Sequence, residues 1–225
     1  MDIIERPSPN FSDRPMGTVI DLVVLHYTGM MSGAAALDRL CDAAAKVSAH
    51  YLIEEDGRAV RLVAEDKRAW HAGFSHWAGA SDINDRSIGI EIVNPGHEFG
   101  YRPFPEAQMV AVEILVAEIM SRHGIAANRV VGHSDIAPSR KQDPGELFDW
   151  QRLAAKGLSV WPADFPPPVD PADALLHLAA IGYDPAANSA EVVTAFQRRF
   201  VPDNVNGALD DRTLAMIAAV HAING

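Results

Sequence analysis

The hydrophobic pattern of the first two thirds of the chain alternates between strand-like runs and helix-like spacing. Residues 18–26 (TVIDLVVLH) and 87–93 (SIGIEIV) are almost continuously apolar and rich in β-branched side chains, which predicts two buried central strands. Residues 49–63 (AHYLIEEDGRAVRLV) predict a hairpin, because Asp56-Gly57 supplies a two-residue turn between aliphatic runs. These segments indicate a sheet that combines buried strands with an antiparallel pair.

Helical spacing of apolar residues dominates the segments between and after these strands. Residues 106–123 repeat their apolar positions at helical spacing, and Gly124 follows as a stop signal. Shorter helices fit residues 34–42 and 149–156, and a short strand fits residues 130–131. The pattern therefore predicts an α/β fold, with a mixed β-sheet flanked by helices.

The composition changes abruptly after the α/β region, which we expect to cover residues 1–157. Residues 159–171 (SVWPADFPPPVDP) contain five prolines, and proline neither continues a helix nor fits a central strand. We therefore expect a semi-rigid linker over residues 158–170 and a small C-terminal domain over residues 171–225. Apolar spacing in that domain predicts three helices, over residues 172–181, 190–200 and 210–223.

The composition limits the possible class, partners and location of the protein. A hydrophobic fraction of 48% is ample for a packed core, and a net charge of −11 without any Lys/Arg run argues against nucleic acid. The single cysteine, Cys41, rules out an intrachain disulfide and has the apolar helical setting of a core residue. No long apolar stretch and no N-terminal leader is visible. We expect a cytoplasmic monomer without membrane insertion, or a cell-envelope (periplasmic) protein if a leader was removed.

Two of the nine histidines stand at the ends of predicted strands. His26 ends the first buried strand and His133 follows the short strand, and strand ends at one sheet edge are where α/β domains build sites. Asp143 comes ten residues after His133. Two imidazoles and one carboxylate are a usual ligand set for catalytic zinc. Spacing alone leaves open a core role for His26 and a turn role for Asp143 before Pro144.

A carboxylate inside an apolar strand adds a second chemical signal. Glu91 lies between Ile90 and Ile92, where an ionised group is costly unless it is paired or used. Alternation along the strand directs its side chain away from theirs and into a cleft, where a raised pKa suits a general base. Lys141, two residues before Asp143, can stabilise an oxyanion at the same place, although alone it is equally typical of a solvated loop.

Five segments of the α/β region carry a specific set of motifs: VVLHYTG, SAHYLIEEDGRAVRLV, RAWHAG, NDRSIGIEIVNPG and VVGHSDIAPSRKQDPG. They occur in this order between about residues 6 and 161. Together they resemble the zinc-dependent N-acetylmuramoyl-L-alanine amidases, within them the AmpD-like branch of the type 2 family. The tail, from residue 173 to 217, resembles a three-helix peptidoglycan-binding domain.

The resemblance implies a function and a site. It implies one zinc ion (Zn²⁺) held by His26, His133 and Asp143, with Glu91 and Lys141 as catalytic residues. The implied reaction is hydrolysis of the amide between N-acetylmuramic acid, ordinary or 1,6-anhydro, and L-alanine in peptidoglycan or muropeptides, in cell-wall turnover or recycling. Residues expected to line the cleft or contact substrate are Trp70, His71 and Asn84; for His71, charge stabilisation and simple packing stay open.

Two other functions remain compatible with the same residues. A non-catalytic peptidoglycan-recognition protein could share the scaffold, but it should lack a zinc ligand or the base, and neither is missing. A zinc peptidase cutting within the stem peptide would share the metal chemistry and differ only in its products.

Overall fold

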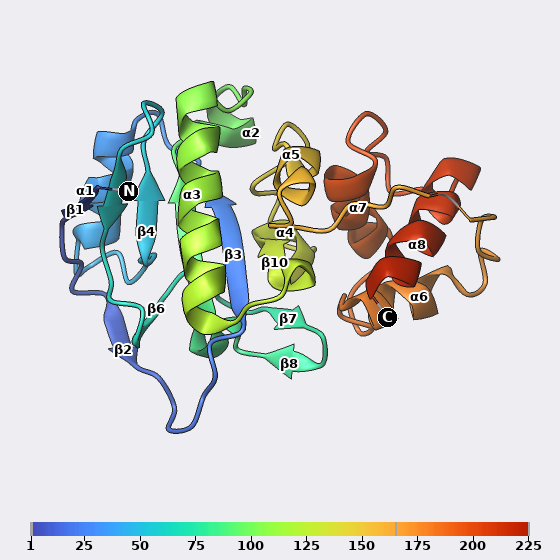
Figure 1. The fold of residues 1–225 in the computed structure, drawn as a ribbon, viewed down its shortest axis with the longest axis horizontal. Helices are drawn as coiled ribbons and strands as arrows, with labels where there is room; N and C mark the ends of the chain where they lie inside the picture. Colours follow the sequence, from blue (N-terminus) through green and yellow to red (C-terminus); the bar gives the residue numbers. More distant parts are fainter. Residues whose placement is uncertain (1, 165, 225) are drawn as a thin grey trace.

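A six-stranded mixed sheet forms the centre of the molecule (Figure 1). The computed structural model describes residues 2–164 and 166–224. Neighbouring strands of this sheet run parallel except β4 and β5, which form an antiparallel pair. In spatial order the strands are β1 (Ile3–Glu5), β5 (Ala59–Arg61), β4 (Tyr51–Ile53), β9 (Ser87–Ile92), β3 (Leu22–Tyr27) and β10 (Val130–Gly132).

The sheet confirms the predicted fold class. The strands expected over residues 18–26 and 87–93 are β3 and β9, which pair in parallel, and the expected hairpin is β4 with β5. β3 begins later than its apolar run suggests. At its start the carboxylate of Asp21 accepts hydrogen bonds from the guanidinium groups of Arg86 and Arg129, so that the residues before it lie outside the ladder.

One face of the sheet is covered by the long helix α3 (Glu106–His123) (Figure 1). Its bounds are those predicted, and it ends at Gly124, whose φ of 67° is the left-handed conformation that glycine adopts readily. Leu115 of α3 is fully buried against strand residues that include Leu25 and Ile90. This face is therefore committed to the apolar core.

The opposite face of the sheet carries apolar core residues in one part and polar site residues in another. Helix α1 (Gly33–Cys41) covers one part of it and packs on Leu52 and Val60. Farther along the sheet, the same face carries His26 and Glu91, which are neighbours across β3 and β9. Helix α1 does not cover these polar groups, and together with them it lines a cleft.

Several short elements escaped prediction, because two to four residues show no periodicity. Each is held by its surroundings, as in the pairing of β2 with β6 and of β7 with β8. They are β1 (Ile3–Glu5), β2 (Phe11–Asp13), β6 (Lys67–Ala69), β7 (His76–Trp77), β8 (Ala80–Ser81), α2 (Gly96–Phe99), α4 (His133–Ile136) and the 3₁₀ turns η1 (Ile83–Arg86) and η2 (Ala127–Arg129).

Three helices follow at the β10 end of the sheet (Figure 1). They are packed around Phe196 and Ile217, which are fully buried. None of the described helices is long and apolar enough to cross a bilayer. The helix preceding the proline-rich segment is α5 (Trp150–Ala155), and the three that follow it are α6 (Ala174–Ile181), α7 (Ser189–Phe200) and α8 (Asp211–Asn224).

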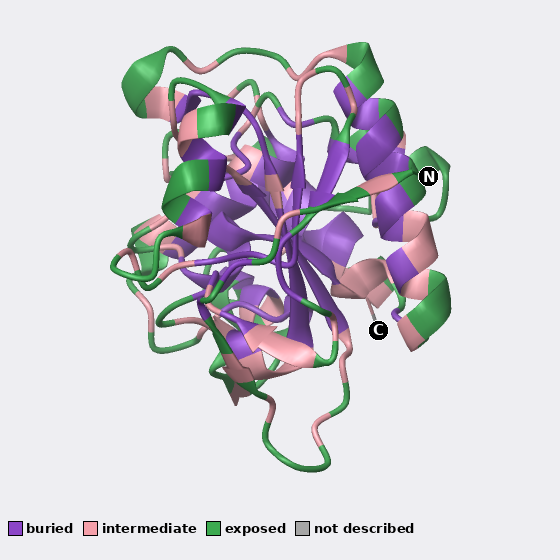
Figure 2. Ribbon diagram, turned by 90° about the vertical axis from the view of Figure 1, so that its left-hand side faces the viewer, coloured by how far each residue is buried: buried purple, intermediate pink, exposed green. Residues whose placement is uncertain are grey.

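The α/β part and the three C-terminal helices share one apolar core. Val24 and Val131 of the sheet belong to the same buried cluster as Phe196 of α7 and Tyr183, and Figure 2 shows buried residues running through the molecule's centre. The boundaries at residues 158–170 stay a prediction from sequence. The shared core shows that the C-terminal helices, called here the helical domain, are docked.

The shared core predicts cooperative unfolding. Because one apolar cluster spans both parts and each part covers apolar surface of the other, we expect one calorimetric transition whose calorimetric and van't Hoff enthalpies agree. Differential scanning calorimetry of the full chain measures both. Two resolved transitions would show that the parts are energetically independent.

Candidate metal centre and catalytic cleft

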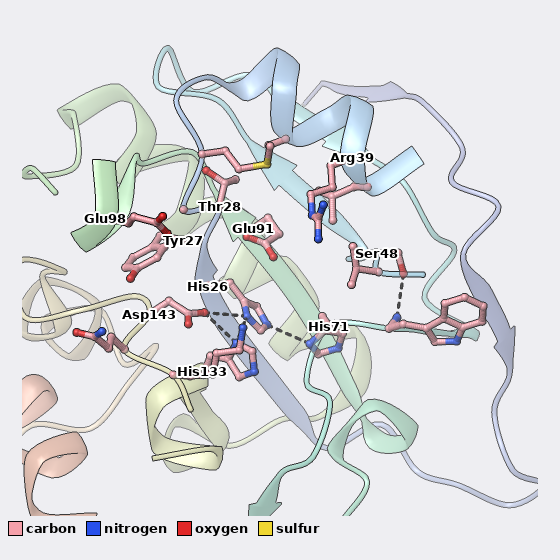
Figure 3. Close-up of a pocket in the computed structure, with 18 of the residues that line it drawn as sticks. His26, Tyr27, Thr28, Arg39, Ser48, His71, Glu91, Glu98, His133 and Asp143 are labelled. Carbon is pink, nitrogen blue, oxygen red and sulfur yellow. Dashed lines mark hydrogen bonds and ion pairs between the residues drawn. The ribbon is translucent and has the colours of Figure 1, made fainter. Parts of the chain in front are cut away.

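Three side chains with metal-binding atoms converge near the carboxyl end of β3 (Figure 3). Nδ1 of His26 lies 2.9 Å from Nδ1 of His133, and Oδ2 of Asp143 lies 3.0 Å from each of these nitrogens. All three residues are buried. The structure thus brings together the three residues that the sequence offers as ligands.

Strand pairing determines the positions of His26 and His133, and also the position of Glu91. In the parallel pair β3–β9, His26 stands opposite Glu91, and in the parallel pair β3–β10, Leu25 stands opposite Gly132. His133 follows Gly132 directly. Because these strands are parallel, their carboxyl ends meet at one edge of the sheet, as in other α/β sites.

Asp143 reaches the same edge through the polar loop that follows α4. The backbone N–H of Ser134 donates to the carbonyl of Asp143 over 2.8 Å, and the hydroxyl of Tyr101 donates to the carbonyl of Pro144 over 2.7 Å. A Cβ on Gly132 would lie 2.8 Å from Cδ of Pro144. The glycine therefore lets the returning loop pack against the end of β10.

The donor set fits a single divalent ion. At a tetrahedral angle, bonds of about 2.0–2.2 Å to nitrogen and oxygen separate neighbouring ligand atoms by roughly 3.3–3.6 Å, so that the three spacings of 2.9–3.0 Å need widen only by a few tenths of an ångström to hold an ion. Burial, with His133 close by, lowers the pKa of His26 to about 4, so that its ring is neutral at neutral pH. Although burial opposes it, the contacts with His133 and His26 hold the pKa of Asp143 well below its usual range.

A directed chain of hydrogen bonds supports the His26 ring from behind. If Nδ1 of His26 binds a metal, its Nε2 carries the proton and donates to Nδ1 of His71, 3.0 Å away. Nε2 of His71 then donates to Oγ of Ser87 over 3.2 Å, and that hydroxyl donates to the carbonyl of Ile83 over 2.6 Å. The carbonyl can only accept, so the chain runs in one direction and exposes the Nδ1 lone pair of His26 to the site.

His133 has an equivalent support. Its Nε2 lies 3.1 Å from the carbonyl of Ala72, to which it donates when Nδ1 serves as ligand. The side-chain oxygen of Asn84 accepts from the N–H groups of His71 and Ala72, over 3.0 and 2.8 Å. Asn84 is buried and lies outside the cleft lining. The structure therefore places it behind both ligand supports, and its expected contact with substrate stays a prediction.

Glu91 is the partly buried acid beside the metal site. Its Oε2 is shielded from solvent and has no hydrogen-bond partner among the described residues. Burial, and secondarily the negative charge of Asp143, raises the pKa of Glu91 well above its ordinary value, while the positive charge of Lys141 opposes the rise. A carboxyl group that readily holds a proton, next to three metal-binding atoms, is suited to general acid–base work.

These groups open into a cleft of about 520 Å³ (Figure 3). Trp70 and His71 line it as expected from sequence, together with Lys141. Trp70 is fixed by its backbone N–H, which donates to Oγ of Ser48 over 2.8 Å. Arg39, on α1, lines the same cleft and was not identified from sequence, because an arginine on a short helix carries no motif.

Arg140 is a second residue that sequence reasoning missed. Its guanidinium donates to the carbonyl of Ala72 over 2.9 Å and also to that of Phe74. It thereby ties the loop that carries the ligand support of His133 to the loop that carries Asp143. These partners lie more than sixty positions away in the chain, and no local pattern reveals them.

Comparison with known proteins shows the family to which the chain belongs. The family model described as N-acetylmuramoyl-L-alanine amidase matches residues 16–146. AmiD of Escherichia coli K12 is 40% identical over 89% of this chain and 82% of its own length. The AmpD of Haemophilus influenzae, a 1,6-anhydro-N-acetylmuramyl-L-alanine amidase, is 37% identical over 64% of this chain and 86% of its own. The chain belongs to the N-acetylmuramoyl-L-alanine amidase family, which confirms the predicted family and enzyme class.

Solved structures extend the similarity beyond the catalytic part. AmiD of E. coli, in complex with anhydro-N-acetylmuramic acid-L-Ala-D-gamma-Glu-L-Lys, superposes with a TM-score of 0.82 at 35% identity and covers 95% of this chain and 98% of its own. AmpDh3 of Pseudomonas aeruginosa gives 0.83 at 36% identity, covering 93% and 94%. These proteins therefore share both the α/β part and most of the helical domain.

The support behind His26 can be tested at Gly89. A Cβ at this position would lie 2.4 Å from the His71 ring, so Gly89→Ala must displace that ring and break its bond to His26. We expect a folded protein whose affinity for its metal falls roughly tenfold or more, the effect of losing a group that orients a ligand. Competition against a chromogenic chelator measures the affinity.

Gly79→Ala is the control for this substitution. Gly79 has a φ of 77°, and a Cβ there meets nothing within 4 Å, so this variant adds backbone strain without touching His71. It should bind metal as the wild type does. Equal affinity in Gly89→Ala would remove His71 from the support of the site.

Proposed function

We propose that this protein uses one zinc ion to hydrolyse the amide bond between the lactyl group of N-acetylmuramic acid and L-alanine. The observation that carries the proposal is the position of Glu91, which lines the cleft with an unpartnered carboxyl oxygen, beside three ligand atoms within 3.0 Å of one another. The family match and the near full-length similarity to AmiD, solved with a muramyl peptide, support it.

His26, His133 and Asp143 would hold the zinc ion through Nδ1, Nδ1 and Oδ2. Zinc at such a three-ligand site supplies a water of lowered pKa and polarises a carbonyl oxygen. Two neutral rings and one carboxylate give the site a single negative charge, which leaves an excess of positive charge once a divalent ion is bound. That excess favours a developing oxyanion over a neutral carbonyl.

Glu91 moves the proton in this scheme. Its carboxylate accepts a proton from the attacking water as the carbon–oxygen bond forms. The same carboxyl group then gives that proton to the nitrogen of L-alanine as the carbon–nitrogen bond breaks. Burial raises the pKa of Glu91, which makes the carboxylate a stronger base and gives the protonated form a lifetime sufficient for the second transfer.

Lys141 and the cleft walls act on the substrate. Lys141 lines the cleft close enough to Glu91 for its charge to affect that carboxyl, and its ammonium would stabilise the oxyanion. Trp70 offers an aromatic surface to the glycan or peptide, and Arg39 offers a cation to a peptide carboxylate. Trp70 and Arg39 would thus orient the substrate, while Lys141 and Glu91 act on the bond that is hydrolysed.

We propose 1,6-anhydro-muramyl peptides as the preferred substrates. AmiD and AmpDh3 have both been solved with anhydromuramic peptides, and this chain covers nearly all of both. We further propose, from the resemblance of residues 173–217, that the helical domain contacts murein. A comparison of rates on intact sacculi and on soluble anhydro-muropeptide separates these two proposals.

Glu91→Gln tests the mechanism, because glutamine keeps the size of the side chain but cannot take up a proton. We expect kcat to fall roughly 10²–10⁴-fold, with about one zinc per chain retained as in the wild type. Release of the L-alanine-initiated peptide, followed by mass spectrometry, gives the rate, and elemental analysis gives the zinc.

The matched control is Glu55→Gln, which removes a carboxylate whose ion pair with Arg102 lies at the surface. It should leave turnover unchanged. Full activity in Glu91→Gln would exclude Glu91 as the proton carrier, and loss of zinc from that variant would make it a ligand instead.

A further inference from the structure

A buried carboxylate lies between the metal site and the helical domain. Asp135, on α4, is almost completely buried. Its Oδ1 accepts a hydrogen bond from the hydroxyl of Tyr183 over 2.7 Å, and its Oδ2 accepts from the guanidinium of Arg199 over 2.9 Å. Oδ2 also accepts from the backbone N–H of Gly132 over 2.8 Å. Tyr183 and Arg199 both belong to the helical domain.

Arg199 is built into this position as firmly as its partner. Its side chain is buried, and the guanidinium also donates to the carbonyl of Val130 and to Oγ of Ser159, each over 3.1 Å. The same group lies 4.2 Å from the centre of the Trp150 ring. An arginine of α7 therefore holds both ends of β10, through the Val130 carbonyl and through Asp135.

This ion pair is connected to the metal ligands by a very short path. Gly132, which donates to Asp135, immediately precedes His133, and Asp135 itself lies two residues after His133. Ser134, between them, donates its N–H to the carbonyl of Asp143. The four-residue turn fixed by Asp135 thus carries one ligand and orients the backbone of the second.

We propose that Arg199 and Tyr183 of the helical domain are positioning residues for the metal centre, acting through Asp135 on His133 and Asp143. The inference rests on the proposed zinc site. It makes the helical domain part of the catalytic unit, in addition to any contact that this domain makes with murein.

Docking of the helical domain rests on several contacts besides the ion pair. The Trp77 and Tyr183 rings lie 5.0 Å apart, the N–H of Ala78 donates to the carbonyl of Gly182 over 2.8 Å, and the apolar cluster spans both parts. An Arg199 variant can therefore stay docked while Asp135 loses its counter-charge. An unpaired buried carboxylate is costly and draws in water or shifts to find partners, and the shift would move the turn that holds His133.

The first test is Arg199→Met, which keeps the length and apolar stem of the side chain and removes its charge. We expect zinc to bind roughly 10–100-fold more weakly, the range found when a group that orients a metal ligand is lost, with kcat reduced more than KM. Competition with a chelator at a temperature well below unfolding gives the affinity, and circular dichroism checks the fold. A merely structural role would lower the unfolding temperature and leave the zinc affinity of the folded protein unchanged.

Two further variants keep the test decisive. Asp135→Asn combined with Arg199→Met removes both charges, and we expect it to bind zinc more tightly than Arg199→Met alone, because no buried charge is left unpaired. Tyr183→Phe deletes one hydrogen bond and should cause a smaller loss of affinity in the same direction. Arg212→Met is the control, since its ion pair with Asp203 is exposed within the helical domain, and its zinc affinity should equal that of the wild type.

The outcomes separate this inference from the proposed function. Wild-type affinity in both folded Arg199→Met and Tyr183→Phe overturns the positioning role and leaves the zinc amidase intact. A wild-type chain that binds no zinc overturns the proposed function itself.

Discussion

The parallel pairing of β3 with β9 is the constraint on which the rest of the site depends. Its register sets His26 opposite Glu91, so that the proposed metal ligand and the proposed proton acceptor stand on adjacent strands and on the same face. A shift by one residue would turn either side chain into the apolar core on the other face. The core formed by α3 with Leu25 and Ile90 resists such a shift. The apolar packing on one face of the sheet thereby determines the positions of the polar site residues on the other face.

Burying the three candidate metal ligands requires that the polar atoms behind them be satisfied. The supports are all buried: His71 and Ser87 behind His26, and the Ala72 carbonyl behind His133. These contacts leave the Nδ1 lone pairs directed to one point. Glu91 is the exception among these site residues, with an oxygen that lacks a partner, and it is the group that we propose exchanges protons during turnover.

Sequence patterns could predict the features that depend on local order. The periodicity of residues 106–123 predicts the bounds of α3 correctly. The apolar run around Glu91 indicates a strand that contains an unexpected carboxylate. Contacts between distant segments left no such signal. The sequence suggests a substrate contact for Asn84 and gives no sign that its side chain accepts from two backbone N–H groups, which only the folded chain shows. The pairing of Asp135 with Arg199, sixty-four positions apart, likewise depends on how the helical domain docks.

The central claim concerns which bond is broken, and hydrolysis of an anhydro-muramyl peptide in oxygen-18-enriched water tests it most directly. The oxygen of the attacking water enters the new carboxylate. If the lactyl–alanine amide is cleaved, mass spectrometry will find the heavy oxygen in the lactyl carboxylate of the muramic acid, beside an unlabelled peptide with a free L-alanine amine. Heavy oxygen in the carboxylate of an amino acid, with the muramic acid still bearing L-alanine, would show cleavage within the stem peptide and contradict the account.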